Sequence, residues 1–73
     1  MLELFGTPGC QYTADLRDDL EFDGRTFAEH DVEADPNALV RMLALTDGRR
    51  TVPVLVEDER VVQIGVGGRG CAV

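Results

Sequence analysis

Apolar residues recur along this chain with two spacings, one typical of strands and the other typical of helices. Residues 2–6 and residues 51–56 are short, mostly apolar runs, which predict two strands. Tyr12, Leu16 and Leu20 follow one another at intervals of four, which predicts an amphipathic helix over residues 11–22. The chain therefore begins with a strand that leads directly into a helix.

A second helix is predicted to begin at Asp35-Pro36. Aspartate is a favoured N-cap residue, and proline is favoured at the first helical position. Residues 26–32 predict a strand before this helix. Residues 61–64 predict a last strand, which a polar turn joins to residues 51–56 in a hairpin. The predicted apolar stripe of the second helix ends before Asp47-Gly48 and consists of Ala38, Leu39, Met42, Leu43 and Leu45.

The predicted element order is β-α-β-α-β-β, which implies an α/β sandwich with a four-stranded mixed sheet. The first two strands should be parallel and joined by a right-handed crossover, because a helix lies between them. The last two should be antiparallel, because the connection between them is short.

Two segments depart from this regular pattern. Pro53 lies inside the run 51–56 and has no amide to donate to a sheet, so it should lie at a strand start, an edge or a special turn. Residues 65–73 have the pattern of neither helix nor strand, and four of the six residues 65–70 are glycine. We therefore expect one domain over residues 1–66 and a flexible tail over residues 67–73.

Composition and charge exclude several classes of function. Seven Arg and no Lys stand against fourteen Asp and Glu, and this net charge of −7 argues against nucleic-acid binding. No apolar stretch approaches the ~18 residues of a membrane helix, and no signal peptide is recognised, so we expect a cytoplasmic monomer. In that compartment, two cysteines favour catalysis or metal binding over a permanent cross-link. They lie far apart in sequence, so we expect no metal site.

Cys10 is the strongest candidate for chemistry. The turn Thr7-Pro8-Gly9-Cys10 joins the first strand to the first helix, which places the thiol at a helix N-terminus. Unpaired backbone amides and the helix dipole favour the thiolate there, and the thiolate is the nucleophile. We therefore expect the pKa of Cys10 to lie below the usual ~8.5. The alternative is a buried structural cysteine, which a turn rich in glycine and proline disfavours.

These residues resemble a glutaredoxin, within the thioredoxin-fold superfamily. The resemblance covers residues 2 to 65 and rests on the segment Gly6–Thr13, on Thr51-Val52-Pro53 and on Gly65. It implies a minimal thioredoxin/glutaredoxin fold with Cys10 as the nucleophile. It also implies a cis bond before Pro53, beside the active cysteine, and a Val52 backbone available to pair with a peptide or with glutathione, a co-substrate of the family.

The chain also departs from the family pattern. Thr13 stands where the dithiol motif has its second cysteine, so the local motif is monothiol. The family's Gly-Gly followed by acidic residues, which opens a last helix, is missing. The tail instead resembles a group called UXX-star, in which a redox residue, selenocysteine in some members, lies three positions from the end. Cys71-Ala72-Val73 fits that arrangement.

Three further residues each have a functional and a structural interpretation. Tyr12 either shapes the surroundings of the thiol or packs in the core. Thr13 either donates a hydrogen bond to a Cys10 thiolate or simply occupies the first helical turn. Arg50, next to Arg49, either binds a ligand carboxylate or is a solvated charge at a helix end. The single histidine, His30, is expected to be structural or exposed.

The leading hypothesis is a glutaredoxin-like thiol–disulfide oxidoreductase acting on protein or small-molecule disulfides. Cys10 would attack the substrate, and Cys71, delivered by the tail, would resolve the mixed disulfide through a reversible bridge to Cys10. The reverse assignment, with Cys71 attacking, is the variant of this hypothesis. The alternatives are a monothiol glutaredoxin-like protein that binds an iron–sulfur cluster or glutathione, and an interaction domain without catalysis.

Overall fold

The computed structural model describes residues 1–73, and its elements follow the predicted order as far as the hairpin. In chain order they are β1 (Leu2–Gly6), α1 (Gln11–Phe22), β2 (Ala28–Asp31), α2 (Pro36–Leu45), β3 (Thr51–Val52), β4 (Val54–Glu57), β5 (Arg60–Ile64) and β6 (Cys71–Ala72). Neither helix has the length and apolar character needed to cross a membrane.

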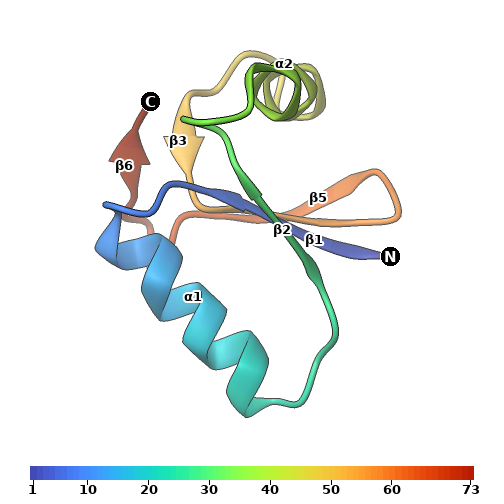
Figure 1. Cartoon of the computed structure of the whole chain (residues 1–73), viewed down its shortest axis with the longest axis vertical. Coiled ribbons are helices and arrows are strands. Elements are labelled where there is room, and N and C mark those ends of the chain that lie inside the picture. Colours follow the sequence, from blue (N-terminus) through green and yellow to red (C-terminus); the bar gives the residue numbers. More distant parts are fainter.

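The four longer strands form one mixed sheet in the order β2-β1-β4-β5. β1 is parallel to β2 and antiparallel to β4, and β4 and β5 form the antiparallel hairpin. The helices lie on opposite faces of this sheet, with α1 below it and α2 above it in Figure 1. The predicted minimal thioredoxin-like fold, with a four-stranded mixed sheet and two helices, is therefore confirmed.

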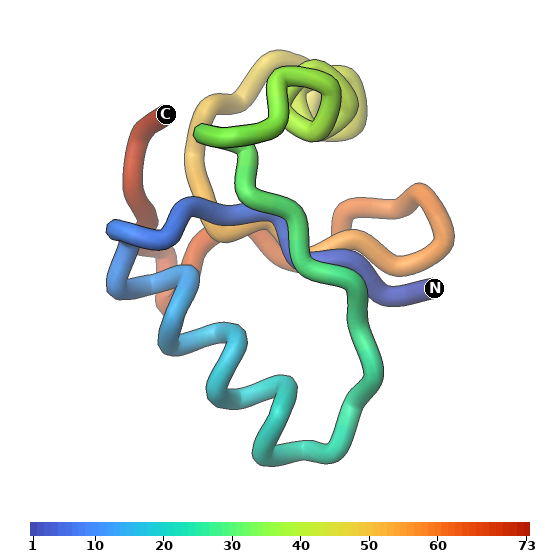
Figure 2. Tube along the Cα trace, in the orientation of Figure 1, coloured from blue at the N-terminus to red at the C-terminus, as the bar shows by residue number.

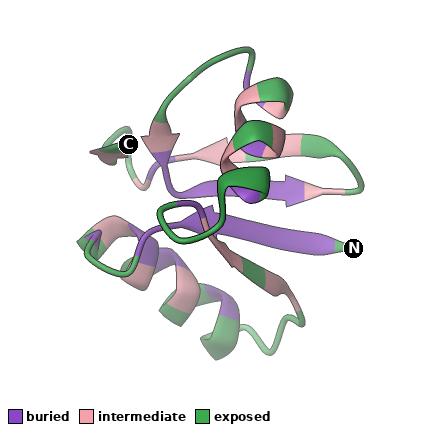
Figure 3. Ribbon diagram, turned by 45° about the horizontal axis from the view of Figure 1, so that its top comes forward, coloured by how far each residue is buried: buried purple, intermediate pink, exposed green.

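Alternation along the central strands sends apolar side chains to both faces. Leu2 and Leu4 of β1 pack in a cluster with Leu16 and Leu20 of α1, whereas Phe5 packs in a second cluster that includes residues of α2. Every residue of β1 is buried, as Figure 3 shows. Successive side chains on a strand point to opposite faces, so a strand covered by helices on both sides is apolar at nearly every position.

The starts of both helices follow the predicted local signals. α2 begins at Pro36, and the side chain of Asp35 accepts hydrogen bonds from the backbone amides of Asn37 and Ala38. This satisfies two of the amides that a helix start leaves unpaired. Cys10 is the N-cap residue of α1, but it makes no side-chain capping hydrogen bond. In the α2 stripe, Ala38 and Met42 are buried and the other three members are half-buried.

The structure divides the run 51–56 at Pro53, where we predicted a single strand. β3 ends at Val52, the bond from Val52 to Pro53 is cis, and β4 begins at Val54. The predicted cis bond is confirmed. β3 pairs with β6 in a separate two-stranded sheet, because a residue without an amide at the junction interrupts the ladder.

The C-terminal segment differs from its prediction as well. It contains the strand β6, where the pattern indicated neither helix nor strand. The reason is tertiary pairing: two residues have too little periodicity to indicate a strand, but the free edge of β3 supplies a partner. The flexibility of residues 67–73 and a domain boundary at residue 66 stay predictions.

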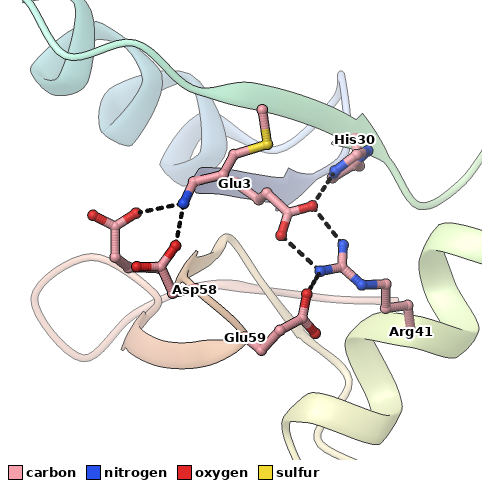
Figure 4. Close-up of polar contacts among 7 residues, drawn as sticks. Glu3, His30, Arg41, Asp58 and Glu59 are labelled. Atoms are coloured by element: carbon pink, nitrogen blue, oxygen red, sulfur yellow. Dashed lines mark hydrogen bonds and ion pairs between the residues drawn. The ribbon is translucent and has the colours of Figure 1, made fainter.

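One carboxylate lies inside the sheet face that α2 covers. Glu3 is 8% exposed and accepts hydrogen bonds from the Arg41 guanidinium of α2, one of them 2.7 Å long, while His30 Nε2 lies 3.0 Å from its other oxygen. Arg41 also contacts Glu59 (Figure 4). Its guanidinium lies over the ring of Phe5. The Arg41 hydrogen bonds are the main reason that the pKa of Glu3 falls from 4.5 to about 2. The network ties β1, β2, α2 and the hairpin together.

This network predicts a pH-dependent contribution to stability. The pKa of Glu3 is lower in the folded chain, so its stabilising effect is complete above about pH 4.5 and is lost as the pH falls through about 2. Glu3→Gln should lower the free energy of unfolding at pH 7 by about 1–3 kcal/mol, because it weakens a buried, charge-assisted hydrogen-bond pair. We expect a value at the low end, since 35% of the Arg41 side chain is exposed to solvent.

Urea denaturation of the parent and the variant from pH 7 downward measures this difference. Glu33→Gln is the matched control, because Glu33 is exposed and forms no ion pair. A difference between Glu3→Gln and the parent that is the same at every pH would contradict this role of the carboxylate.

Candidate redox site

The two cysteines meet at one end of the molecule. Cys10 and Cys71 form a disulfide with their Cα atoms 6.1 Å apart, although 61 positions separate them in sequence. This distance lies within the usual range for disulfides. Figures 1 and 2 show β6 running beside β3 and close to the turn that precedes α1. The expected intramolecular bridge is therefore present in the structure.

Cys10 is buried in this state, with 2% of its surface exposed, whereas Cys71 is half-buried. The expectation that a Gly- and Pro-rich turn would leave Cys10 exposed was therefore wrong. Pro8 and Gly9 are indeed exposed, but the cysteine after them belongs to the cluster that contains Val52. Cys10 Sγ lies 4.0 Å from the carbonyl oxygen of Val52. Solvent therefore reaches the disulfide mainly from the Cys71 side.

The local backbone holds Cys10 at the start of α1. The amide of Cys10 donates to the carbonyl of Thr7, and the carbonyl of Cys10 accepts from the amide of Ala14, at 3.3 and 3.2 Å. Cys10 itself has extended dihedral angles, which an N-cap residue requires. An acceptor side chain at an N-cap position faces the backbone amides of the second and third helical residues. The disulfide-bonded sulfur of Cys10 accepts no hydrogen bond from them.

Backbone pairing holds the tail on the edge of β3. Val52 is opposite Cys71 and Thr51 is opposite Ala72, in antiparallel register. Beyond this pair, the amide of Val73 donates to the carbonyl of Arg50 at 2.9 Å. The Val52 backbone, expected to be available to a peptide, is therefore paired with the chain's own tail.

Arg50 also contacts the tail through its side chain. Its Nε donates to the main-chain oxygen of Val73 at 2.5 Å. The guanidinium expected to meet a ligand carboxylate thus meets the tail in this state, whereas Arg49 forms no ion pair. Arg50 therefore marks the far end of the surface that the tail covers.

A tight turn returns the tail toward β3. Val66 and Arg69 exchange two backbone hydrogen bonds, of 2.7 and 3.0 Å. Between them, Gly67 and Gly68 both have positive φ, of 59° and 80°. Positive φ at both central residues is typical of hairpin turns of type I′, and glycine adopts it without steric cost. The glycines therefore permit one particular reversal of direction.

The other predicted site residues lie in or next to this cluster. Pro53 is buried beside Val52, and Tyr12 packs on the same cluster from α1. Thr13 is fully buried, and its Oγ1 is the only buried side-chain nitrogen or oxygen without a hydrogen-bond partner. Gly6 must be small because a Cβ there would lie 2.2 Å from Cγ2 of Thr13.

Sequence reasoning missed one residue of the site. It counted Gly70 only as part of a flexible segment, but a Cβ at this position would lie 2.4 Å from the carbonyl oxygen of Val52. The only indication in the sequence that Gly70 belongs to the site is its position immediately before Cys71. His30, expected to be structural or exposed, contacts Glu3 and the ring of Phe5.

Comparison with known proteins places this architecture in a family. The family model described as Glutaredoxin matches residues 2–62. The chain belongs to the glutaredoxin family. The family match ends before the tail turn, so β6 and Cys71 lie outside it. The likeness of the tail to the UXX-star group stays a prediction.

Two solved structures have the same fold. They are crystal structures of the thioredoxin-like protein BC3987 and of a threonine-to-alanine mutant of it. Each is 27% identical to this chain, with a TM-score of 0.78 over 85% of it, and the match covers 84% and 82% of those chains respectively. No curated protein matches this sequence.

The position of Cys10 at the start of α1 leads to a test in the reduced protein. In a Cys71→Ser background, the alkylation rate of Cys10 should rise with a midpoint below the usual thiol pKa of ~8.5, because the helix N-terminus stabilises the thiolate. A midpoint at or above that value would show that burial, which raises the pKa of a thiol, outweighs the helix N-terminus.

Proposed function

We propose that this member of the glutaredoxin family is a thiol–disulfide oxidoreductase. Cys10 attacks the substrate disulfide, and Cys71 resolves the mixed disulfide that forms on Cys10. The observation that supports this assignment is the juxtaposition of the two sulfurs, with Cys10 at a helix N-terminus and Cys71 on a tail that a single reversal brings to it. A protein or small-molecule disulfide as substrate, a monomeric state and a cytoplasmic location belong to the same proposal.

The first half-reaction forms a mixed disulfide. The Cys10 thiolate attacks one sulfur of the substrate disulfide and forms a new S–S bond, and the other substrate sulfur leaves with the electron pair as a thiolate. For this step the tail must leave β3, because in the bridged state Cys10 is buried and its sulfur is already bonded.

The second half-reaction returns the tail. The Cys71 thiolate attacks the Cys10 sulfur of the mixed disulfide, the Cys10–Cys71 bond forms, and the second substrate thiolate leaves. The substrate has then gained two electrons and the protein has lost two. A first external thiolate, for which glutathione is our candidate co-substrate, attacks the more exposed Cys71 sulfur, forms a mixed disulfide with it and releases the Cys10 thiolate. A second external thiolate attacks the external sulfur of that mixed disulfide, so Cys71 leaves as a thiolate and the two external thiols leave as their disulfide. No step requires a metal.

Thr13 is proposed to assist the Cys10 thiolate. Side chains at the N-cap and at the third helical residue lie on the same side of the first turn, as in the capping box. In the bridged state the Thr13 hydroxyl has no partner, and a buried hydroxyl without one is unfavourable. A thiolate at Cys10 would supply an acceptor for it, so the hydroxyl favours the reduced form.

The isosteric substitution Thr13→Val tests this role. It should raise the pKa of Cys10 by about one unit, because a hydrogen bond to a charged group contributes roughly 1.5–3 kcal/mol and one pKa unit corresponds to about 1.4 kcal/mol. It should also make the Cys10–Cys71 disulfide harder to reduce. Alkylation against pH and a redox titration measure the two effects. An unchanged pKa would leave Thr13 with a packing role only.

The decisive comparison is between Cys10→Ser and Cys71→Ser in disulfide reduction with glutathione as reductant. Cys10→Ser should be inactive. Cys71→Ser should accumulate mixed disulfides on Cys10, visible by mass spectrometry. Its turnover should fall roughly tenfold or more at about 0.1 mM glutathione, because a tethered thiol acts at an effective concentration on the order of millimolar.

Ala72→Ser is the matched control, since Ala72 is the exposed neighbour of Cys71. If Cys71→Ser turns over as fast as the parent, the protein works as a monothiol glutaredoxin and the tail cysteine is dispensable. A visible absorption band in anaerobically purified protein would instead favour the iron–sulfur alternative.

A further inference from the structure

The tail shows how an extended peptide with a reacting cysteine lies at this site. β6 is antiparallel to β3, the residue opposite Val52 carries the sulfur bonded to Cys10, and the next residues along the tail pair with Thr51 and Arg50. A substrate cysteine must bring its sulfur to the same place. The inference that follows rests on the proposed function, because it concerns which substrates Cys10 accepts.

The position immediately before that cysteine has no room for a side chain. A Cβ at Gly70 would lie 2.4 Å from the carbonyl oxygen of Val52 and 2.7 Å from Cγ2 of Thr51. Contacts under 3.0 Å require something to move, and the nearer atom is backbone. Val52 is fully buried and is followed by the buried Pro53, so this part of β3 is held by the core on its other side.

Backbone conformation does not explain the glycine at this position. Gly65, Gly67 and Gly68 have positive φ, which side chains disfavour, but Gly70 does not. Positive φ is therefore not the reason for a glycine at residue 70. The requirement at Gly70 is therefore one of contact with β3, and it applies to whatever peptide lies there.

The position after the cysteine is different. Ala72 carries a side chain, and it is exposed. The edge of β3 therefore has no room for a side chain immediately before the reacting cysteine, but it has room for one immediately after it.

We propose that Cys10 selects substrates that bind β3 in the register of the tail and have no side chain immediately before the reacting cysteine. Glycine meets this requirement in a peptide or protein. Tail and substrate compete for the same backbone edge, so the site is open to a substrate only after the Cys10–Cys71 bond is broken.

Reduced Cys71→Ser protein, which has a single thiol, tests this selection. The probes are three peptides whose cysteine is joined by a disulfide to 5-thio-2-nitrobenzoate: Arg-Gly-Cys-Ala-Val, Arg-Ala-Cys-Ala-Val and Arg-Gly-Cys-Val-Val. Cys10 attacks the peptide sulfur, the new S–S bond forms, and thionitrobenzoate leaves as the coloured thiolate. Mass spectrometry verifies the peptide on Cys10, and free cysteine in place of the protein measures the intrinsic reactivity of each peptide.

After this correction, the peptide with alanine before cysteine should react at least about tenfold more slowly than the first peptide, because its methyl group overpacks the β3 edge. The peptide with valine after cysteine should stay within about threefold, as for other exposed substitutions. Equal rates for the peptides with glycine and with alanine before cysteine would overturn this inference and leave the proposed function intact. If Cys10 reacts with none of the peptides, the proposed function fails as well.

The intact chain offers an independent measurement. Gly70→Ala should lower the equilibrium constant for formation of the Cys10–Cys71 disulfide, measured against dithiothreitol, by roughly tenfold. Ala72→Val is the control and should change it little, because Ala72 is exposed. Alanine loses less conformational entropy than glycine when the tail becomes ordered, so this effect alone would raise the equilibrium constant. An unchanged constant for Gly70→Ala would overturn the inference.

Discussion

Antiparallel pairing between Val52 and Cys71 is the interaction on which the whole redox site depends. β3 has only two residues, and its edge is available because Pro53, which has no amide to donate, separates it from the four-stranded sheet. Unpaired backbone groups at an exposed edge invite another strand. The tail supplies that strand and thereby brings the Cys71 sulfur to Cys10, which is buried in this state.

The same arrangement links stability to redox state in a very small domain. A chain of 73 residues buries a modest share of its surface, so each additional constraint matters. A bridge that spans 61 positions restricts the unfolded chain strongly and typically contributes about 2–4 kcal/mol. In the proposed function, opening the bridge to admit a substrate therefore removes this constraint in the same step that exposes Cys10.

The family scaffold and the tail make different contributions. The glutaredoxin match over residues 2–62 includes the Cys10 turn, both helices and the cis-proline strand, which together position one thiol at a helix start. The second sulfur comes from beyond that match, through the reversal at Gly67-Gly68. Thr13 stands three positions after Cys10, where a dithiol motif has its partner cysteine, and the tail supplies a distant one instead.

Much of the fold was determined by local patterns in the sequence. Apolar periodicity predicted the two helices and the order of the elements as far as the hairpin, apart from the division of residues 51–56 at Pro53. Asp35-Pro36 predicted the start of α2, and the resemblance around Thr51-Val52-Pro53 predicted the cis bond. These features depend on residues within a few positions of one another, or on a motif that can be read directly from the chain.

Only the tertiary structure decided how the site is completed. Burial of Cys10, pairing of the tail with β3, contact between Arg50 and Val73 and the steric requirement at Gly70 all join residues that are 18 or more positions apart. Glu3 lies within an apolar run but is paired with Arg41 from α2, which no local pattern indicates. Periodicity reports which face of an element is apolar, whereas these contacts depend on which ends of the chain the folded sheet brings together.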